Sequence, residues 1–243
     1  MFNSKLTGKV VSVRELSSLE RERMFELMNG NYDSVKKETF EKDLAEKSDV
    51  ILLRDNKDQQ IQGFSTLMIL EELVRGDITR ALFSGDTIID KTYWGDTQLE
   101  HHWGRYAFSL IDKNPEIPLF WFLMSKGYKT YKFLPVFFNE FYPRYDKPTP
   151  TYEQEVLDTF ARKKFPLNYD PKTGLVVFEG QKDRLKQGVA DIDERRMRDP
   201  HVKYFIERNP HWQQGDELCC IMPLRKDNFN RMALRIIGSN KLR

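Results

Sequence analysis

The sequence has few of the residues that would cross-link it or place it in a membrane. Only two cysteines occur among 243 residues, Cys219 and Cys220, and they are adjacent. Because successive strand residues point to opposite faces, a bond between these two would be strained, which argues against a disulfide framework. Nothing approaches 18 consecutive apolar residues, and the first residues lack the apolar run of a signal peptide. We therefore expect a cytoplasmic protein without a membrane span.

Histidine and net charge are also scarce. The four histidines lack ligand spacing with cysteines or carboxylates, so no metal site is expected. Neither cysteine has a histidine nearby in an arrangement that would make it a nucleophile. The 39 lysines and arginines nearly balance 37 acidic residues, and the net charge of +2 does not suggest nucleic-acid binding. Any basic patch must therefore be local.

Length and aromatic content, by contrast, are ample. The chain is long enough for one large domain or two small ones, and 40% of its residues are hydrophobic. Aromatic residues make up 13%, including 17 phenylalanines. Core packing accounts for most of these rings, and a ligand tunnel lined by aromatic side chains is a second use for them.

Hydrophobic periodicity predicts a mixed α/β fold. The run PLFWFLMS at 118–125 is apolar throughout, which is typical of a strand buried on both faces. Other strands are expected at 10–13, 49–55, 61–73, 79–90, 175–180 and 216–224. Helices are expected at 19–32 (capped by Ser17 or Ser18), 34–47, 97–111, 126–145 (capped by Ser125 and ended or kinked by Pro135), 152–165, 183–198, 201–209 (capped by Asp199) and after Asp227.

The order of these elements resembles the GCN5-related N-acetyltransferase (GNAT) fold. A strand, two helices, a meander of three strands, a turn into a helix, a buried strand and another helix occupy roughly Lys9 to Tyr145. The resemblance implies a mostly antiparallel twisted sheet flanked by helices, with residues 1–145 as the acyltransferase core. Residues 146–243 are then expected to form a C-terminal helical and strand extension that completes this sheet or packs on it.

The family's phosphate-binding loop would fall on residues 92–97, with departures. Thr92 replaces a basic or amide residue, Thr97 replaces the second glycine, and Asp96 adds a negative charge. The resemblance implies that the acyl donor contacts Trp94, Gly95, Asp96 and Thr97. The alternative is that Asp96 caps the following helix itself. A donor with fewer phosphates tolerates Asp96 better than coenzyme A does, which favours an acyl carrier protein, where one phosphodiester holds the pantetheine.

The same resemblance implies direct attack by an amine on a pantetheine thioester, polarised by backbone N–H groups around Ile88 and Ile89. No permanently bound cofactor is expected, and acyl-CoA or acyl-phosphopantetheine serves as co-substrate. A protonated amine needs a proton acceptor. Asp86, at an expected bulge after Gly85, and His102, beside the buried helix face, are preferred over Asp90, Glu100 and His101. Tyr142, ahead of Tyr131, would protonate the leaving thiolate.

A lysine stripe and an aromatic cluster complete the predicted site. Lys126, Lys129 and Lys132, with Arg144 and Lys147 beyond, are either a docking surface for an acidic carrier protein or a solvated helix face. A long acyl tunnel, or the core, would contain Phe133, Phe137, Phe138, Phe141 and Tyr142. The predicted function is N-acyl transfer from acyl-CoA or an acyl carrier protein to an amine. The alternatives are a non-catalytic module that binds a thioester, carrier protein or peptide, and a thioester decarboxylase served by Asp86.

Overall fold

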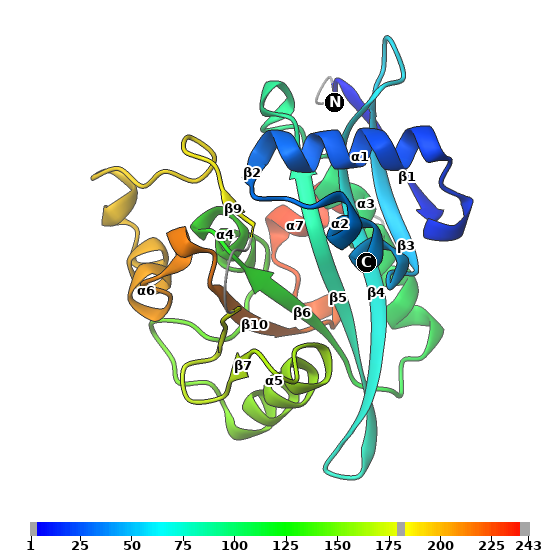
Figure 1. Ribbon diagram of the computed structural model, residues 1–243. Helices are drawn as coiled ribbons and strands as arrows, with labels where there is room; N and C mark the ends of the chain where they lie inside the picture. The colour runs from blue at the N-terminus through cyan, green and yellow to red at the C-terminus, as the bar shows by residue number, and fades with distance from the viewer. Residues whose placement is uncertain (1–3, 179–182, 239–243) are drawn as a thin grey trace.

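A computed structural model describes residues 4–178 and 183–238 of the chain (Figure 1). Within these residues, eight strands form one sheet in the order β1-β3-β4-β5-β6-β10-β8-β7. Only β5 and β6 run parallel, and the other neighbouring pairs are antiparallel. The predicted fold class is confirmed. The strands are β1 (Leu6–Ser12), β3 (Asp49–Asp55), β4 (Ile61–Val74), β5 (Asp77–Ile89), β6 (Leu119–Ser125), β7 (Tyr169–Asp170), β8 (Leu175–Val176) and β10 (Glu217–Pro223).

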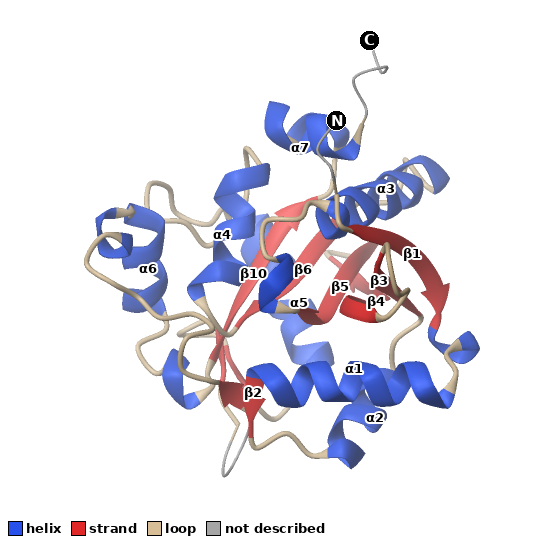
Figure 2. Cartoon of the chain, turned by 90° about the horizontal axis from the view of Figure 1, so that it is seen from above, coloured by secondary structure: helices blue, strands red, loops and turns tan. Residues whose placement is uncertain are grey.

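Helices cover both faces of this sheet (Figure 2). Alternate residues of a strand point to opposite faces. Leu82 of β5 belongs to a core cluster with α3, α4, α6 and α7, and its neighbour Phe83 to a cluster with α5. Val50 of β3 faces α1 and α2, whereas Ile51 lies in the α3 cluster. The helices are α1 (Ser18–Asn31), α2 (Lys37–Ala45), α3 (Gln98–Lys113), α4 (Tyr128–Phe137), α5 (Thr151–Lys164), α6 (Pro200–Arg208) and α7 (Arg231–Ile237).

Local capping explains where several helices begin. The Ser17 hydroxyl accepts the Glu20 N–H at 3.3 Å, and the Glu20 carboxylate accepts the Ser17 N–H at 2.8 Å. Asp199 caps α6 by accepting the His201 N–H at 2.9 Å. Both caps were predicted. Asp227 was predicted to cap the last helix, which was wrong, because Asn230 accepts the N–H groups of Met232 and Ala233 at the start of α7.

The sheet opens between β5 and β6. These strands pair only from Arg80 with Leu119 to Ser84 with Leu123. Beyond that point the register of β5 against β4 shifts, because Ser65 opposes Thr87 while Leu67 opposes Ser84. The predicted bulge at Gly85 is therefore present, and it turns β5 away from β6. The end of β5 has β4 on one edge and no strand on the other among the described residues.

The segment 183–198 departs from its predicted helix. It contains the short strand β9 (Arg184–Leu185), which pairs with β2 (Tyr32–Asp33), and a 3-10 turn at Arg196–Arg198. Its charges suit a helix, but Gly188 takes a left-handed conformation with φ of 85°. The segment buries Ala190 and packs the partly buried Leu185 against the core instead of forming a helix of its own. The predicted strand 175–180 is shorter, and its last two residues lie outside the described ranges.

The helix expected at 126–145 is shorter in the structure. As α4 it begins after Gly127, not Ser125, ends at Phe137 and contains Pro135 in its last turn. On the other side of β6 from β5, strand β10 pairs with β6. Among the described residues, no helix is both long and apolar enough to cross a membrane.

Candidate active site

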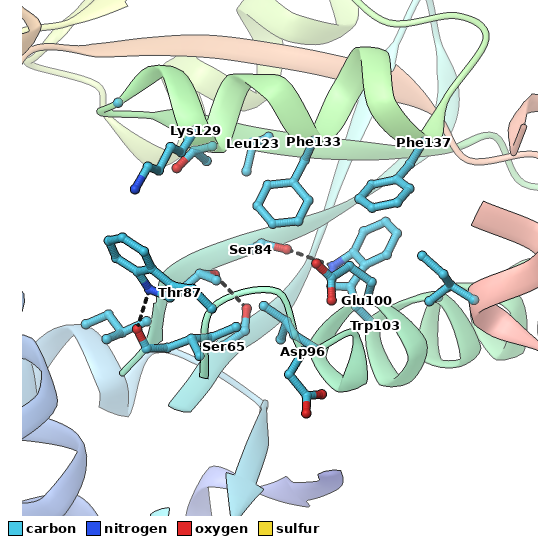
Figure 3. A pocket seen from close by; sticks show the side chains of 18 of the residues that line it. Ser65, Ser84, Thr87, Asp96, Glu100, Trp103, Leu123, Lys129, Phe133 and Phe137 are labelled. Carbon is cyan, nitrogen blue, oxygen red and sulfur yellow. Dashed lines mark hydrogen bonds between the residues drawn. The ribbon is translucent and has the colours of Figure 1, made fainter. Parts of the chain in front are cut away.

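A cavity of about 430 Å³ opens where β5 leaves β6. Its floor includes Ser84 and Thr87 of β5 and Leu123 of β6, and α3, α4 and α7 form its walls. Figure 3 shows Phe133 and Phe137 projecting from α4 toward α3, where Glu100 and Trp103 project toward them. Its volume is within the range of about 300–1,000 Å³ that is usual for small-molecule sites. The other lining residues include Tyr32, Ile89, Trp94, Leu99, Gly104, Lys129, Thr130, Phe138, Leu185, Val189, Ala190, Phe229, Ala233, Ile236 and Ile237.

Helix α7 closes one side of this cavity because α3 has a glycine, Gly104, where the two helices meet. A Cβ added to Gly104 would lie 2.4 Å from Cγ1 of Ile237. The two helices therefore approach more closely than any other residue at this position would permit. Ala233 and Ile237 of α7 complete the apolar wall.

Glu100 lines the cavity from α3, and Asp96, before that helix, is the other carboxylate among the described lining residues. Glu100 is largely buried, and no described residue gives its Oε2 atom a hydrogen bond. Burial raises the pKa of Glu100 to about 6, with Asp96 adding to the rise and the backbone N–H of Glu100 opposing it. An unpaired carboxyl group in apolar surroundings with a raised pKa is the usual signature of a functional group.

This carboxyl group should make the protein less stable as the pH rises. Its folded-state pKa lies above its ordinary value of 4.5. The stability that it contributes is therefore present below about pH 4.5 and lost as the pH passes 6. Relative to Glu100→Gln, the wild type should lose about 2 kcal/mol of unfolding free energy between pH 4.5 and 7.5. Urea denaturation at intervals of one pH unit measures this difference. The exposed Glu116→Gln variant should follow the wild type, and parallel curves for Glu100→Gln would contradict the prediction.

Ser84 holds two tryptophans at the cavity floor. Its hydroxyl oxygen accepts the indole N–H of Trp103 at 3.1 Å and that of Trp121 at 2.9 Å. The two indole rings lie 4.3 Å apart, centroid to centroid, and both side chains are buried. The Ser84 hydroxyl group thus fixes aromatic rings from α3 and β6 against each other. Sequence reasoning missed this group, although a serine inside the apolar run ALFSG was a visible signal.

The turn before α3 uses its polar groups within the protein. The Asp96 carboxylate accepts the Gln98 N–H at 3.0 Å, the Lys5 N–H at 3.0 Å and the Ser4 hydroxyl at 2.7 Å. The N–H groups of Trp94 and Asp96 donate to backbone carbonyls of the preceding turn. Gly95 takes a left-handed conformation with φ of 93°. Asp96 thus satisfies one N–H of the first turn of α3, in line with the predicted alternative, although Thr97 stands at the N-cap position.

The three predicted catalytic side chains are not brought together. Asp86 follows the bulge of β5, outside the cavity lining, in a cluster of charges on the α2 side. Burial raises the pKa of Asp86 to about 7, and Asp43 adds to the rise while Lys47 and Lys126 oppose it. The Lys47 ammonium lies 2.5 Å from an Asp43 carboxylate oxygen. Asp86 was predicted as a general base turned into the cleft, but it is not among the residues that line the cavity.

His102 and Tyr142 also lie away from the cavity, which argues against the predicted roles. The His102 ring packs on β1, so that a Cβ at Gly8 would lie 2.1 Å from its Cδ2 atom. Burial lowers the pKa of His102, and His101 and Arg105 lower it further. Tyr142 is buried on the opposite face of the sheet, in the α5 cluster. Of the other candidates, Tyr131 donates its hydroxyl to the Pro143 carbonyl at 2.9 Å, and His101 Nδ1 lies 2.9 Å from the Ile236 carbonyl oxygen.

The predicted lysine stripe is also divided. Lys126 is 13% exposed, with its ammonium 2.5 Å from Asp183 and 3.4 Å from Glu217. Lys132 pairs with Asp199. Lys129 alone lies at the cavity, with its ammonium 3.6 Å from the centroid of the Trp94 ring. The three lysines therefore do not form one exposed surface, because carboxylates from later parts of the chain fold onto two of them.

Lys129 belongs to a different basic cluster. Burial lowers the pKa of Lys129, and the nearby Arg196 and Lys91 lower it further. Among the described residues, Lys91 and Lys129 have no carboxylate within ion-pair distance, whereas Arg196 pairs with Asp193 at 3.0 Å. Lys91 and Arg196 are thus close enough to Lys129 to act on its charge, and Asp191 partly offsets them.

A scan against protein-family models finds no match, and no curated protein matches the sequence. Among solved structures, a conserved protein from Enterococcus faecalis, described as a probable N-acyltransferase, matches with 16% identity and a TM-score of 0.41. The match covers 56% of this chain and 33% of that protein. The GNAT family N-acetyltransferase YhbS from Escherichia coli, in complex with CoA, matches with 12% identity and a TM-score of 0.37. That match covers 51% of this chain and 64% of YhbS.

Glucosamine-6-phosphate N-acetyltransferase from Arabidopsis thaliana matches with 17% identity and a TM-score of 0.33, over 48% of this chain and 81% of that one. This chain spans one third of the first protein's length and just under two thirds of YhbS. All three proteins are described as N-acyltransferases or N-acetyltransferases, the first of them as a probable one.

Proposed function

We propose that this protein is an N-acyltransferase that moves an acyl group from a pantetheine thioester to an amine. The observation that carries the proposal is the edge of β5 at the cavity, with which no described strand pairs and where the Ile89 carbonyl accepts the Trp94 indole N–H at 3.0 Å. The Asp90 N–H donates to the Gln62 carbonyl at 2.8 Å, toward β4. Because backbone groups alternate along a strand, the N–H groups of Thr87 and Ile89 point to the other edge. The Ile88 N–H points toward β4, so only Ile89 of the predicted pair suits the role.

A pantetheine arm can pair with this edge as an added strand would. It carries two amides, and main-chain hydrogen bonds to a free strand edge are a general mode of binding extended ligands. A thioester carbonyl placed on the Ile89 N–H would be polarised as the amine attacks. The new C–N bond forms as the C–S bond breaks, the amine gives up a proton, and the thiolate leaves.

The charges near the turn favour a donor with a single phosphate. Asp96 repels a pyrophosphate and has already taken the Gln98 N–H. Lys129 lines the cavity, Lys91 and Arg196 are close enough to lower its pKa, and such a group of cations can hold one phosphodiester. We therefore favour acyl-phosphopantetheine on a carrier protein over free acyl-CoA. The same Asp96 contacts are the observation that favours the second candidate, a module that binds such a thioester without catalysis. The decarboxylase alternative depends on Asp86, which lies outside the cavity.

Filling the cavity should abolish acyl transfer without unfolding the protein. Thr130 lines the cavity from α4, and no hydrogen bond of its hydroxyl group to another described residue would be lost. Thr130→Trp is expected to reduce amide formation at least tenfold, roughly the effect of losing one well-placed contact in free-energy terms. Mass spectrometry of products from acyl-CoA and acyl-carrier donors with a set of amines measures this. Ser109→Trp, which adds the same ring at an exposed position of α3, is the matched control.

A rate of amide formation that is the same in Thr130→Trp as in the wild type would place the reaction outside this cavity. Donor binding by the wild type without any amide product would favour the non-catalytic module.

A further inference from the structure

The Glu100 carboxyl group sets a condition on whatever occupies the cavity. The surrounding wall is apolar, with Trp103 of α3 and Phe133 and Phe137 of α4 facing the same space (Figure 3). The Oε2 atom has no hydrogen-bond partner among the described residues. A plain hydrocarbon chain would expel water and leave this carboxyl group buried and unpaired, which is costly. An occupant with its own carboxylate would be repelled.

An ammonium group satisfies this condition. It donates to the carboxylate as a charge-assisted hydrogen bond, and aromatic faces nearby stabilise a cation further. The remaining apolar wall then accepts a hydrocarbon or aromatic body. We infer that the cavity binds a lipophilic primary amine, whose ammonium pairs with Glu100 and whose apolar part lies between α3 and α4. The role of this amine as the acyl acceptor rests on the proposed function, whereas its binding does not.

The position of Glu100 suits the binding of an amine that accepts the acyl group. It lies three residues before Trp103, on the same face of α3. Trp103 reaches Ser84, the last residue of β5 that pairs with β6. An amine on Glu100 is therefore held in the same cavity as Ser84 and Ile89 of β5, where the strands separate. The ammonium first gives one proton to the Glu100 carboxylate, which frees the nitrogen lone pair. The nitrogen then bonds to the thioester carbon as the C–S bond breaks, and its second proton passes to the leaving thiolate.

The protonation of Glu100 makes binding depend on pH. The titratable groups that line the cavity are Tyr32 of β2, Asp96 before α3, Glu100 of α3 and Lys129 of α4. With its pKa raised to about 6, Glu100 is mostly ionised at pH 7.5 and mostly protonated at pH 5. Amine affinity should therefore fall as the pH is lowered through 6.

Titration calorimetry with octylamine, octanol and octanoate tests the inference without any acyl donor. At pH 7.5 the wild type should bind octylamine about tenfold more tightly than octanol and octanoate most weakly, a difference typical of one charge-assisted hydrogen bond. Glu100→Gln should remove the preference for the amine, and the exposed Glu116→Gln should keep it. Lowering the pH to 5 should weaken octylamine binding and leave octanol binding unchanged.

Octanol or octanoate binding as tight as octylamine in the wild type would overturn the inference, whether or not the glutamine variant folds. Retention of the amine preference by folded Glu100→Gln would overturn it as well. Octylamine binding without amide formation from any donor would defeat the proposed function alone. Amide formation with no preference for lipophilic amines would defeat this inference alone.

Discussion

Turnover by Glu100→Gln is expected to be about 10²–10⁴ times lower than that of the wild type, the usual effect of losing a general base. The amide keeps the size of the side chain but cannot accept the proton of the attacking amine. The KM for the amine should rise as well, because the charge partner of its ammonium is lost. Initial rates of amide formation with octylamine, measured at several donor and amine concentrations, separate the two effects.

The pH profile distinguishes proton transfer from simple positioning. The active form of Glu100 is the carboxylate, so the wild-type rate should rise through a pKa near 6. This rise of the rate with pH should be absent in Glu100→Gln. Asp86→Asn is the comparison, because Asp86 carries a raised pKa but lies outside the cavity. We expect it to change stability through its contacts with Lys47 and Lys126 and to change turnover less than tenfold. If Asp86→Asn lowers turnover more than Glu100→Gln does, Asp86 and not Glu100 is the general base.

Ser84→Ala is expected to lower the free energy of unfolding by about 2–5 kcal/mol. The substitution leaves the indole N–H groups of Trp103 and Trp121 buried without their acceptor. Each unpaired buried donor costs roughly 1–3 kcal/mol. Urea denaturation measures the loss. Ser109→Ala, at an exposed position of α3, should change stability by no more than about 0.5 kcal/mol.

A double-mutant cycle tests the mechanism of this loss. In a Trp121→Phe background only one donor remains for Ser84 to satisfy, so Ser84→Ala should cost markedly less there than in the wild type. An equal cost in both backgrounds would mean that the hydroxyl acts through packing and not through these hydrogen bonds.

Elements whose signals are local could be predicted from the sequence. The cap at Ser17 depends on Glu20 three residues away, and the strand 49–55 was predicted with the bounds that the structure has. The bulge at Gly85 was also readable, because glycine in a strand favours one. Each of these features is determined by residues within a few positions of one another.

The candidate site could be predicted only in part, because its walls come from distant segments. Glu100 was among the expected carboxylates, but its burial depends on α4 and α7 packing across from it. The ion pairs of Lys126 with Asp183 and Glu217 could not be predicted, because both carboxylates lie more than 50 residues away in the sequence. Tyr142 lies in a stretch whose periodicity did not show which face of the sheet it would reach. The charged segment 183–198 suits a helix by itself, yet β9 pairs with β2 about 150 residues earlier.

The place of β10 in the sheet has a consequence for the order in which the chain can fold. Strand β6 pairs with β10, which is synthesised more than 90 residues later. While the chain emerges from the ribosome, the apolar strand LFWFLMS has β5 on one edge and an unsatisfied edge on the other. Such an edge is a template for pairing with other chains. A nascent or truncated chain without residues 217–223 would therefore be prone to aggregate, and completion of the sheet by this late, non-local pairing would limit how fast the protein folds.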